Sequence, residues 1–169
     1  DEEANLGLAD RLQDAGVQVV YGVVGYKTHA KMLLIVRREG KSLRRYVHLG
    51  TGNYHSGTAR AYTDFSLMTA NPAIGNDVHL IFQQLSGLAA PLKLRHLLQS
   101  PFTLHARLLE LIGEQTQRVR AGGAGRIVAR MNSLTEPQVI EALYEASRAG
   151  VQVDLVVRGI CVLRPGMPG

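Results

Sequence analysis

Helical and strand spacings of apolar residues alternate along the first part of the chain. In residues 2–16 the apolar positions recur three or four apart and the run ends on a glycine, which predicts a helix. The next stretch, VQVVYGVV at 17–24, predicts a strand because it is apolar and rich in β-branched residues. After a turn at Gly25, residues 27–36 read KTHAKMLLIV, and their wholly apolar second half predicts a strand covered on both faces.

Two further elements are expected before residue 87. Residues 44–54, RRYVHLGTGNY, predict a strand that runs into a glycine-rich turn. Asn71 and Pro72 predict the start of a helix, because asparagine caps the first free amide groups and proline suits the first helical position. The buried stripe of this helix is expected to comprise Ile74, Val78, Ile81, Phe82 and Leu85.

The pattern weakens after residue 87 and becomes regular again beyond residue 101. Residues 102–120 predict a long amphipathic helix, which a cluster of glycines ends. Residues 126–132, RIVARMN, predict a short strand. Thr135 and Gln138 then predict a capping box at the start of the next helix.

The alternation of helices and strands predicts an α/β protein with two domains, residues 1–100 and residues 101–169. The last expected element is the strand VQVDLVVRG at 151–159. The junction AGVQV, where a helix runs into a strand, occurs at 15–19 and again at 149–153. This repeat is only a weak indication of two related halves, because a helix, a glycine stop and a β-branched strand are common in α/β proteins.

Composition narrows the class of partner. The chain has 169 residues, 46% of them hydrophobic, which is enough for a hydrophobic core. A net charge of +5 favours an anionic partner such as nucleic acid, a membrane surface or a phosphorylated substrate. Cys161 is the only cysteine, which excludes an internal disulfide and is typical of the cytoplasm. No apolar run is long enough to span a membrane, and we interpret the two ends, DEEAN and RPGMPG, as cuts in a longer protein.

Three residues of the segment KTHAK form the first candidate site. Alternate side chains of a strand share a face, so Lys27, His29 and Lys31 would project together. Two ammonium groups would disfavour protonation of His29, keep it nucleophilic and neutralise the oxygens of an incoming phosphate. The alternative is a packed or solvated histidine beside two surface lysines.

Two neighbouring segments could assist. In GTGNY the glycines let the backbone approach a phosphate and the amide of Asn53 can donate to it. In TARAYTD, residues 58–64, Arg60 and Tyr62 would share a face if the segment is extended, and could bind phosphate and stack on a base. A surface arginine and a half-buried tyrosine are the alternative.

Two arginines mark the second half of the chain. Arg158 follows an apolar strand, and Arg130 has a similar position on the strand before it. Ligands of α/β sheets gather at the carboxyl ends of strands, so both are phosphate-binding candidates. They could equally be strand-end residues that reach solvent.

Together these segments resemble the polyphosphate kinase family in its long bacterial form, which is phosphorylated on histidine. The resemblance rests on the order of DEEAN, AGVQVVYGVVGYKTHAK, RRYVHLGTGNY, TARAYTD, RIVARMNSL and VDLVVRGIC. It implies that the chain covers the two carboxyl-terminal domains of that family. Each would have a phospholipase D-like β-sheet flanked by helices, the first domain nearly complete and the second truncated.

The resemblance also implies roles. His29 would be the autophosphorylated nucleophile, Tyr62 would contact ATP and Arg158 would bind the nucleotide phosphates. The other phosphate-binding residues would be Lys27, Lys31, Asn53, Arg60 and Arg130. Phospholipase D relatives carry an acidic residue at the position of Val36, so this departure points away from phosphodiester hydrolysis.

The implied reaction is reversible transfer of the terminal phosphate of ATP to polyphosphate through phosphohistidine, with release of ADP and with Mg²⁺ held mostly by residues outside this chain. These residues have no counterpart of three features of the family: its amino-terminal domains, its magnesium-binding arginines and its second active-site histidine. The fragment alone should therefore be inactive. The full-length enzyme is expected to be a homo-oligomer in the cytoplasm, free or peripheral to the inner membrane.

Two alternative functions stay open. A phospholipase D-like phosphodiesterase or nuclease would use the same histidine on a different bond. A non-catalytic nucleic-acid-binding module would use the positive charge, but nine aromatic residues and no tryptophan supply few stacking platforms.

Overall fold

The computed structural model describes residues 2–87 and 93–168, with side chains from residue 6 onward. The chain divides into two compact units, residues 1–97 and residues 98–169. The α/β class, with β-sheets flanked by helices, is confirmed, and each unit contains its own sheet.

The first helix, α1 (Glu2–Asp14), begins and ends close to the predicted positions. Its stop is Gly16, which adopts a φ of 83° that side chains other than glycine rarely tolerate. The amide of Val17 donates to the carbonyl of Leu12 across this turn, at 2.9 Å. The glycine therefore ends α1 by closing the last helical turn.

The strand predicted at 17–24 is wrong. Within the part of the chain that the structure describes, this stretch pairs only through an isolated bridge between Val23 and Tyr26, around the turn at Gly25. Val20 and Val24 are 46% and 98% exposed. An apolar β-branched run becomes a strand only when a partner strand satisfies its backbone groups, and sequence composition does not supply that partner.

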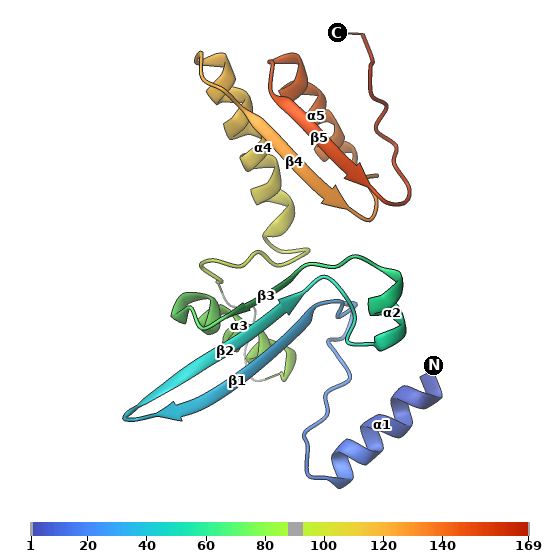
Figure 1. The fold of residues 1–169 in the computed structure, drawn as a ribbon, viewed down its shortest axis with the longest axis vertical. Helices are drawn as coiled ribbons and strands as arrows, with labels where there is room; N and C mark the ends of the chain where they lie inside the picture. Colours follow the sequence, from blue (N-terminus) through green and yellow to red (C-terminus); the bar gives the residue numbers. More distant parts are fainter. Residues whose placement is uncertain (1, 88–92, 169) are drawn as a thin grey trace. The chain divides into compact units, whose positions relative to one another are not determined.

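The sheet of the first unit has three antiparallel strands (Figure 1). They are β1 (Lys31–Glu39), β2 (Ser42–Gly50) and the short β3 (Ser66–Thr69), in the order β1-β2-β3. The β1–β2 hairpin pairs from Lys31 opposite Gly50 to Glu39 opposite Ser42. Its turn is made at Gly40, which has a φ of 61°.

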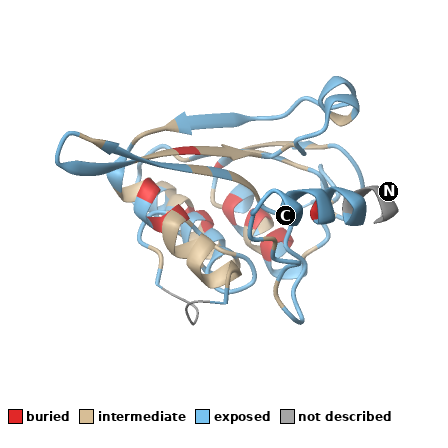
Figure 2. Ribbon diagram, turned by 90° about the horizontal axis from the view of Figure 1, so that it is seen from below, coloured by how far each residue is buried: buried red, intermediate tan, exposed pale blue. Residues whose placement is uncertain are grey.

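Among the described residues, helical cover lies on one face of this sheet. The helix α3 (Pro72–Leu85) packs against β2 and β1, and Val47 of the sheet and Val78 of the helix are buried between them. On the opposite face Leu33, Ile35 and Met68 are 44%, 52% and 80% exposed. The expectation that β1 is covered on both faces is therefore wrong, and Figure 2 shows that the hairpin end is exposed.

Helix α3 begins as predicted. The side-chain oxygen of Asn71 accepts from the amides of Ala73 and Ile74, at 2.9 and 3.3 Å, and Pro72 is the first helical residue. The sequence analysis missed Asp77, which is 1% exposed. Its carboxylate accepts from the amides of Arg95, His96 and Leu97 at 3.1, 2.7 and 2.9 Å. Asp77 therefore fastens the returning segment 95–97 to α3.

The second unit is a parallel strand pair with two helices. Its elements are α4 (Leu104–Arg120), β4 (Arg126–Met131), α5 (Pro137–Arg148) and β5 (Gln152–Val157). The strands pair from Arg126 opposite Gln152 to Met131 opposite Val157. The core of this unit comprises Ile112, Leu134, Val139, Ile140, Leu143, Ala146 and Val151.

The cap of α5 differs from the predicted one. Glu136, not Thr135, is the cap, and its Oε2 accepts from the amide of Val139 at 2.7 Å. The same oxygen lies 3.2 Å from Nε2 of His105 on α4. This second partner is distant in sequence, so a local capping pattern could not indicate it.

Candidate functional site

The histidine singled out by sequence lies just before the first strand. His29 is exposed, and its carbonyl accepts from Nζ of Lys31 at 2.6 Å. Because β1 begins at Lys31, the argument that strand geometry puts Lys27, His29 and Lys31 on one face is wrong. Strand pairing for residues 27–30 is absent from the described structure, so alternation does not orient their side chains.

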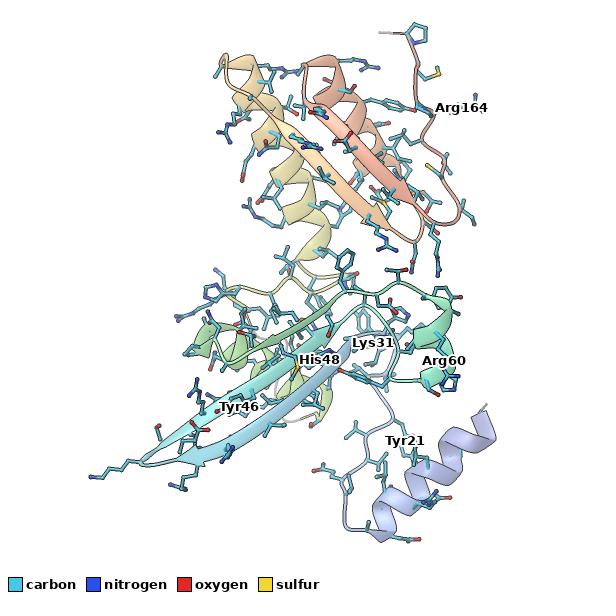
Figure 3. All side chains as sticks on the ribbon, in the orientation of Figure 1. Tyr21, Lys31, Tyr46, His48, Arg60 and Arg164 are labelled. Carbon is cyan, nitrogen blue, oxygen red and sulfur yellow. The ribbon has the colours of Figure 1, made fainter. Side chains whose placement is uncertain are left out.

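The hairpin register brings two of the candidate segments together. Lys31, two residues after His29, pairs with Gly50, the first glycine of the glycine-rich turn. The segment that carries His29 and the loop that carries Asn53 therefore leave the sheet at the same end. Figure 3 shows Lys31 and His48 at this end, with Tyr46 farther along the hairpin.

The glycine-rich loop is fastened by Asp64. The hydroxyl of Thr51 donates to Asp64 Oδ1 at 3.0 Å and accepts from the amide of Phe65 at 3.0 Å. The amide of Thr51 donates to the carbonyl of Phe65 at 3.0 Å. The Asp64 carboxylate also packs so closely over Gly52 that a methyl group at position 52 would overlap it. Glycine is thus required here for space.

A second histidine sits beside this loop, and the sequence analysis missed it. His48 Nδ1 lies 2.7 Å from the hydroxyl of Tyr54, and Nε2 lies 2.5 Å from the hydroxyl of Ser66. In a neutral ring one nitrogen donates and the other accepts. The sequence could have indicated His48 by its position two residues before Gly50. Alternate residues of a strand share a face, so His48 lies on the face of β2 to which Gly50 belongs, next to the loop. His48 therefore links Tyr54 of the loop to Ser66, the first residue of β3.

Residues 56–61 form a helix, which corrects the extended conformation considered for TARAYTD. This helix, α2 (Ser56–Ala61), contains Arg60 in its last turn, and Tyr62 follows as its carboxyl cap. His55 starts α2, because its Nδ1 accepts from the amide of Thr58 at 3.2 Å. Arg60 and Tyr62 therefore do not share a strand face, although Tyr62 is 48% exposed.

The two candidate arginines of the second unit lie at one edge of its sheet. Arg130 is the residue before the end of β4, opposite Val156. Arg158 follows β5 directly, and its amide donates to the carbonyl of Met131 at 3.1 Å. Parallel pairing therefore places both at the carboxyl edge.

The described residues contain neither a metal-binding cluster nor a membrane-spanning helix. Across the side chains described, those of residues 6–87 and 93–168, no group of three or more His, Cys, Asp or Glu is arranged to hold a metal ion. Over the same residues, no helix is both long and apolar enough to cross a membrane.

Comparison with known proteins agrees with the order of motifs. Residues 1–91 match the family model for polyphosphate kinase C-terminal domain 1, and residues 97–169 match the model for C-terminal domain 2. The chain belongs to the polyphosphate kinase family. The recognition of this family from sequence is confirmed.

Individual relatives cover the whole chain. It is 75% identical over 169 residues to a polyphosphate kinase of Xylella fastidiosa and 59% identical over 169 residues to one of Pseudomonas aeruginosa. The crystal structure of polyphosphate kinase from Porphyromonas gingivalis matches 99% of the chain at 40% identity, with a TM-score of 0.88. The chain spans 24% of the length of those two curated relatives and 28% of the chain in the crystal structure.

Proposed function

We propose that this chain carries the phosphorylated histidine of a polyphosphate kinase, which transfers the terminal phosphate of ATP to polyphosphate reversibly. The observation that supports this most is the exposed ring of His29 beside the strand pair that leads into the glycine-rich loop, in a chain whose relatives are polyphosphate kinases. A nucleophile must be reachable by substrate, and an exposed imidazole meets this requirement.

The proposed reaction has two steps. An imidazole nitrogen of His29 attacks the terminal phosphorus of ATP, the bond between that phosphorus and its bridging oxygen breaks, and ADP leaves. A terminal oxygen of polyphosphate then attacks the phosphohistidine, and the nitrogen–phosphorus bond breaks. Each step moves one phosphoryl group, so the reverse sequence makes ATP from ADP and polyphosphate.

The other candidate residues would stabilise charge. Lys27 and Lys31 flank His29 in sequence, and a positive charge near the transferred group lowers the cost of its developing negative charge. Asn53 lies in a loop that Asp64 and His48 hold in place. We assign phosphate contacts to Arg60 and Arg130, and nucleotide contacts to Tyr62 and Arg158.

The two steps proposed above use residues of this chain, and none of them is proposed as a ligand of Mg²⁺. The described residues do not present a cluster of three ligands, and the family resemblance implies that most Mg²⁺ ligands lie outside this chain. Bound to ATP, the ion would neutralise phosphate oxygens.

The test is histidine labelling of the full-length enzyme. With ATP labelled on its terminal phosphate, His29→Ala should abolish acid-labile, base-stable labelling, because the nucleophile is gone. His96→Ala is the matched control, since His96 is also exposed in the first unit. Unchanged labelling of the His29→Ala enzyme would remove the proposal. Cleavage of a generic phosphodiester without nucleotide would favour the phosphodiesterase alternative instead.

A further inference from the structure

The far end of the β1–β2 hairpin concentrates positive charge. Residues 37–45 contain five cationic residues, Arg37, Arg38, Lys41, Arg44 and Arg45, and one acidic residue, Glu39. Four of the five are exposed, whereas Arg45 is half-buried. We name residues 37–44 the cationic tip. Figure 1 shows this end of the hairpin extending away from α3.

The register of the hairpin places like charges opposite each other, and this repulsion opposes folding. Arg37 lies directly opposite Arg44, and like charges in that relation repel. The only local acid, Glu39, lies 3.4 Å from Arg44 and accepts from the hydroxyl of Tyr46 at 2.5 Å. That hydroxyl, more than Arg44, holds the pKa of Glu39 below its usual range. A single carboxylate is therefore the only negative side chain among several cationic ones at this end of the hairpin.

Three cations of the tip make no direct contact with a described acidic side chain. Within the described part of the chain, Arg37, Arg38 and Lys41 form no salt bridge and no side-chain hydrogen bond. Exposed cations close together raise the local positive potential and attract a polyanion. The excess charge at the tip thus suits a ligand with many negative charges in a row.

The chemistry of the tip favours an inorganic polyanion over nucleic acid. Proteins that bind single strands stack bases on aromatic rings. The aromatic residue next to the tip is Tyr46, and the Arg44 guanidinium lies 5.3 Å from its ring centre while Glu39 holds its hydroxyl. Arg44 thus lies over one face of this half-buried ring, and residues 37–44 include no aromatic residue, so the tip presents charge without stacking rings of its own.

The tip and the candidate active site lie at opposite ends of the same two strands. β1 has nine residues and begins at Lys31, two residues after His29. At a rise of about 3.3 Å per residue, the tip is about 20 to 30 Å from that end. A ligand that reaches both places must be a long chain.

We propose that the cationic tip is a second docking site for long-chain polyphosphate, which holds the distal part of the chain while its end reacts near His29. The proposal rests on the proposed function for the identity of the ligand. It predicts that the tip matters for long chains and has no role in reaction with short ones.

The experiment compares two full-length variants with equal charge loss. The tip variant is Arg37→Gln/Arg38→Gln/Lys41→Gln, which leaves the Glu39, Arg44 and Tyr46 contacts intact. The control variant is Arg11→Gln/Lys93→Gln/Arg118→Gln, which removes two exposed arginines and one exposed lysine elsewhere. Direct equilibrium binding without ATP is measured for long-chain polyphosphate and for tripolyphosphate at several salt concentrations.

The expected result is about tenfold weaker binding of long-chain polyphosphate by the tip variant, with a shallower salt dependence, as expected when a polyanion loses about three charge contacts. Tripolyphosphate binding and histidine labelling by ATP should equal those of the wild type. Equal weakening by the control variant, or equal weakening for tripolyphosphate, would overturn the proposal. The proposal would also be overturned if the tip variant binds polyphosphate normally but no longer binds single-stranded DNA or anionic vesicles.

The two proposals fail separately. If His29 is not labelled in the wild type, the proposed function fails, yet the binding comparison still tests the tip. If labelling depends on His29 and the tip variant binds long chains normally, only the tip proposal fails.

Discussion

At the scale of single residues, the candidate site depends on close contacts around its glycine-rich loop. Thr51, Asp64 and Phe65 hold one side of the loop, and His48 holds Tyr54 and Ser66. Gly52 is the point of closest approach, because the Asp64 carboxylate occupies the space that a side chain would need. The position of Asn53 therefore follows from its neighbours.

Gly52→Ala should impair phosphoryl transfer in the full-length enzyme. The added methyl group must displace Asp64 or the loop, and a displacement of about 1 Å at a reacting site costs up to about a hundredfold in rate. We expect the initial rate of histidine labelling to fall about ten- to a hundredfold. Gly113→Ala is the control, because a methyl group there meets no atom within 4 Å. Equal rates for both variants would show that the loop takes no part in the transfer.

At the scale of elements, Asp77 connects α3 to segment 95–97 through buried hydrogen bonds. Burial opposes the charge of this carboxylate, but the amides of His96, Leu97 and Arg95 outweigh it, so the pKa of Asp77 is lowered. A carboxyl group with a lowered folded pKa stabilises the fold above its unfolded pKa. That stability is lost as pH falls through the folded pKa.

Asp77→Asn should destabilise the first unit by about 1–3 kcal/mol at neutral pH, because its amide nitrogen cannot accept from the buried amides. The difference from the wild type should shrink as pH falls below about 4, where an aspartate of the unfolded chain becomes protonated, and on through the lowered pKa of Asp77 in the folded protein. Thermal unfolding of both proteins from neutral pH to below about pH 4 measures this difference in stability. Asp14→Asn, at an exposed position, should change little. A pH-independent difference would contradict the electrostatic explanation.

At the scale of the whole molecule, the first unit leaves one face of its sheet open. Leu33, Ile35 and Met68 are exposed together on the face opposite α3, and exposed apolar patches favour association. The 169-residue chain on its own should therefore bind a hydrophobic dye and associate as its concentration rises.

Ile35→Lys/Met68→Lys should reduce both effects, measured by dye fluorescence and by sedimentation. Ile160→Lys is the control, since Ile160 is 70% exposed in the second unit. If the control reduces dye binding as much as the double variant, the open sheet face is not its cause.

Local chemistry made several elements predictable from sequence. The cap at Asn71 and Pro72, the glycine stop after α1 and the apolar periodicity of α4 act within one or two helical turns, so the sequence contains what they need. The ordered motifs likewise identified the family. The predicted roles of His29, Tyr62 and the arginines remain predictions.

Features that depend on contacts between residues far apart in the sequence were decided only by the tertiary structure. Residues 17–24 have strand composition but no ladder in the described chain, β1 is open on one face, and Glu136 replaces Thr135 as a cap that also contacts His105. The hydrogen bonds of the buried Asp77 and the hydrogen bond between His48 and Ser66 join residues 18 to 20 positions apart. Helix signals are local in sequence, whereas strand pairing, burial and side-chain clusters are set by contacts between segments that only folding brings together.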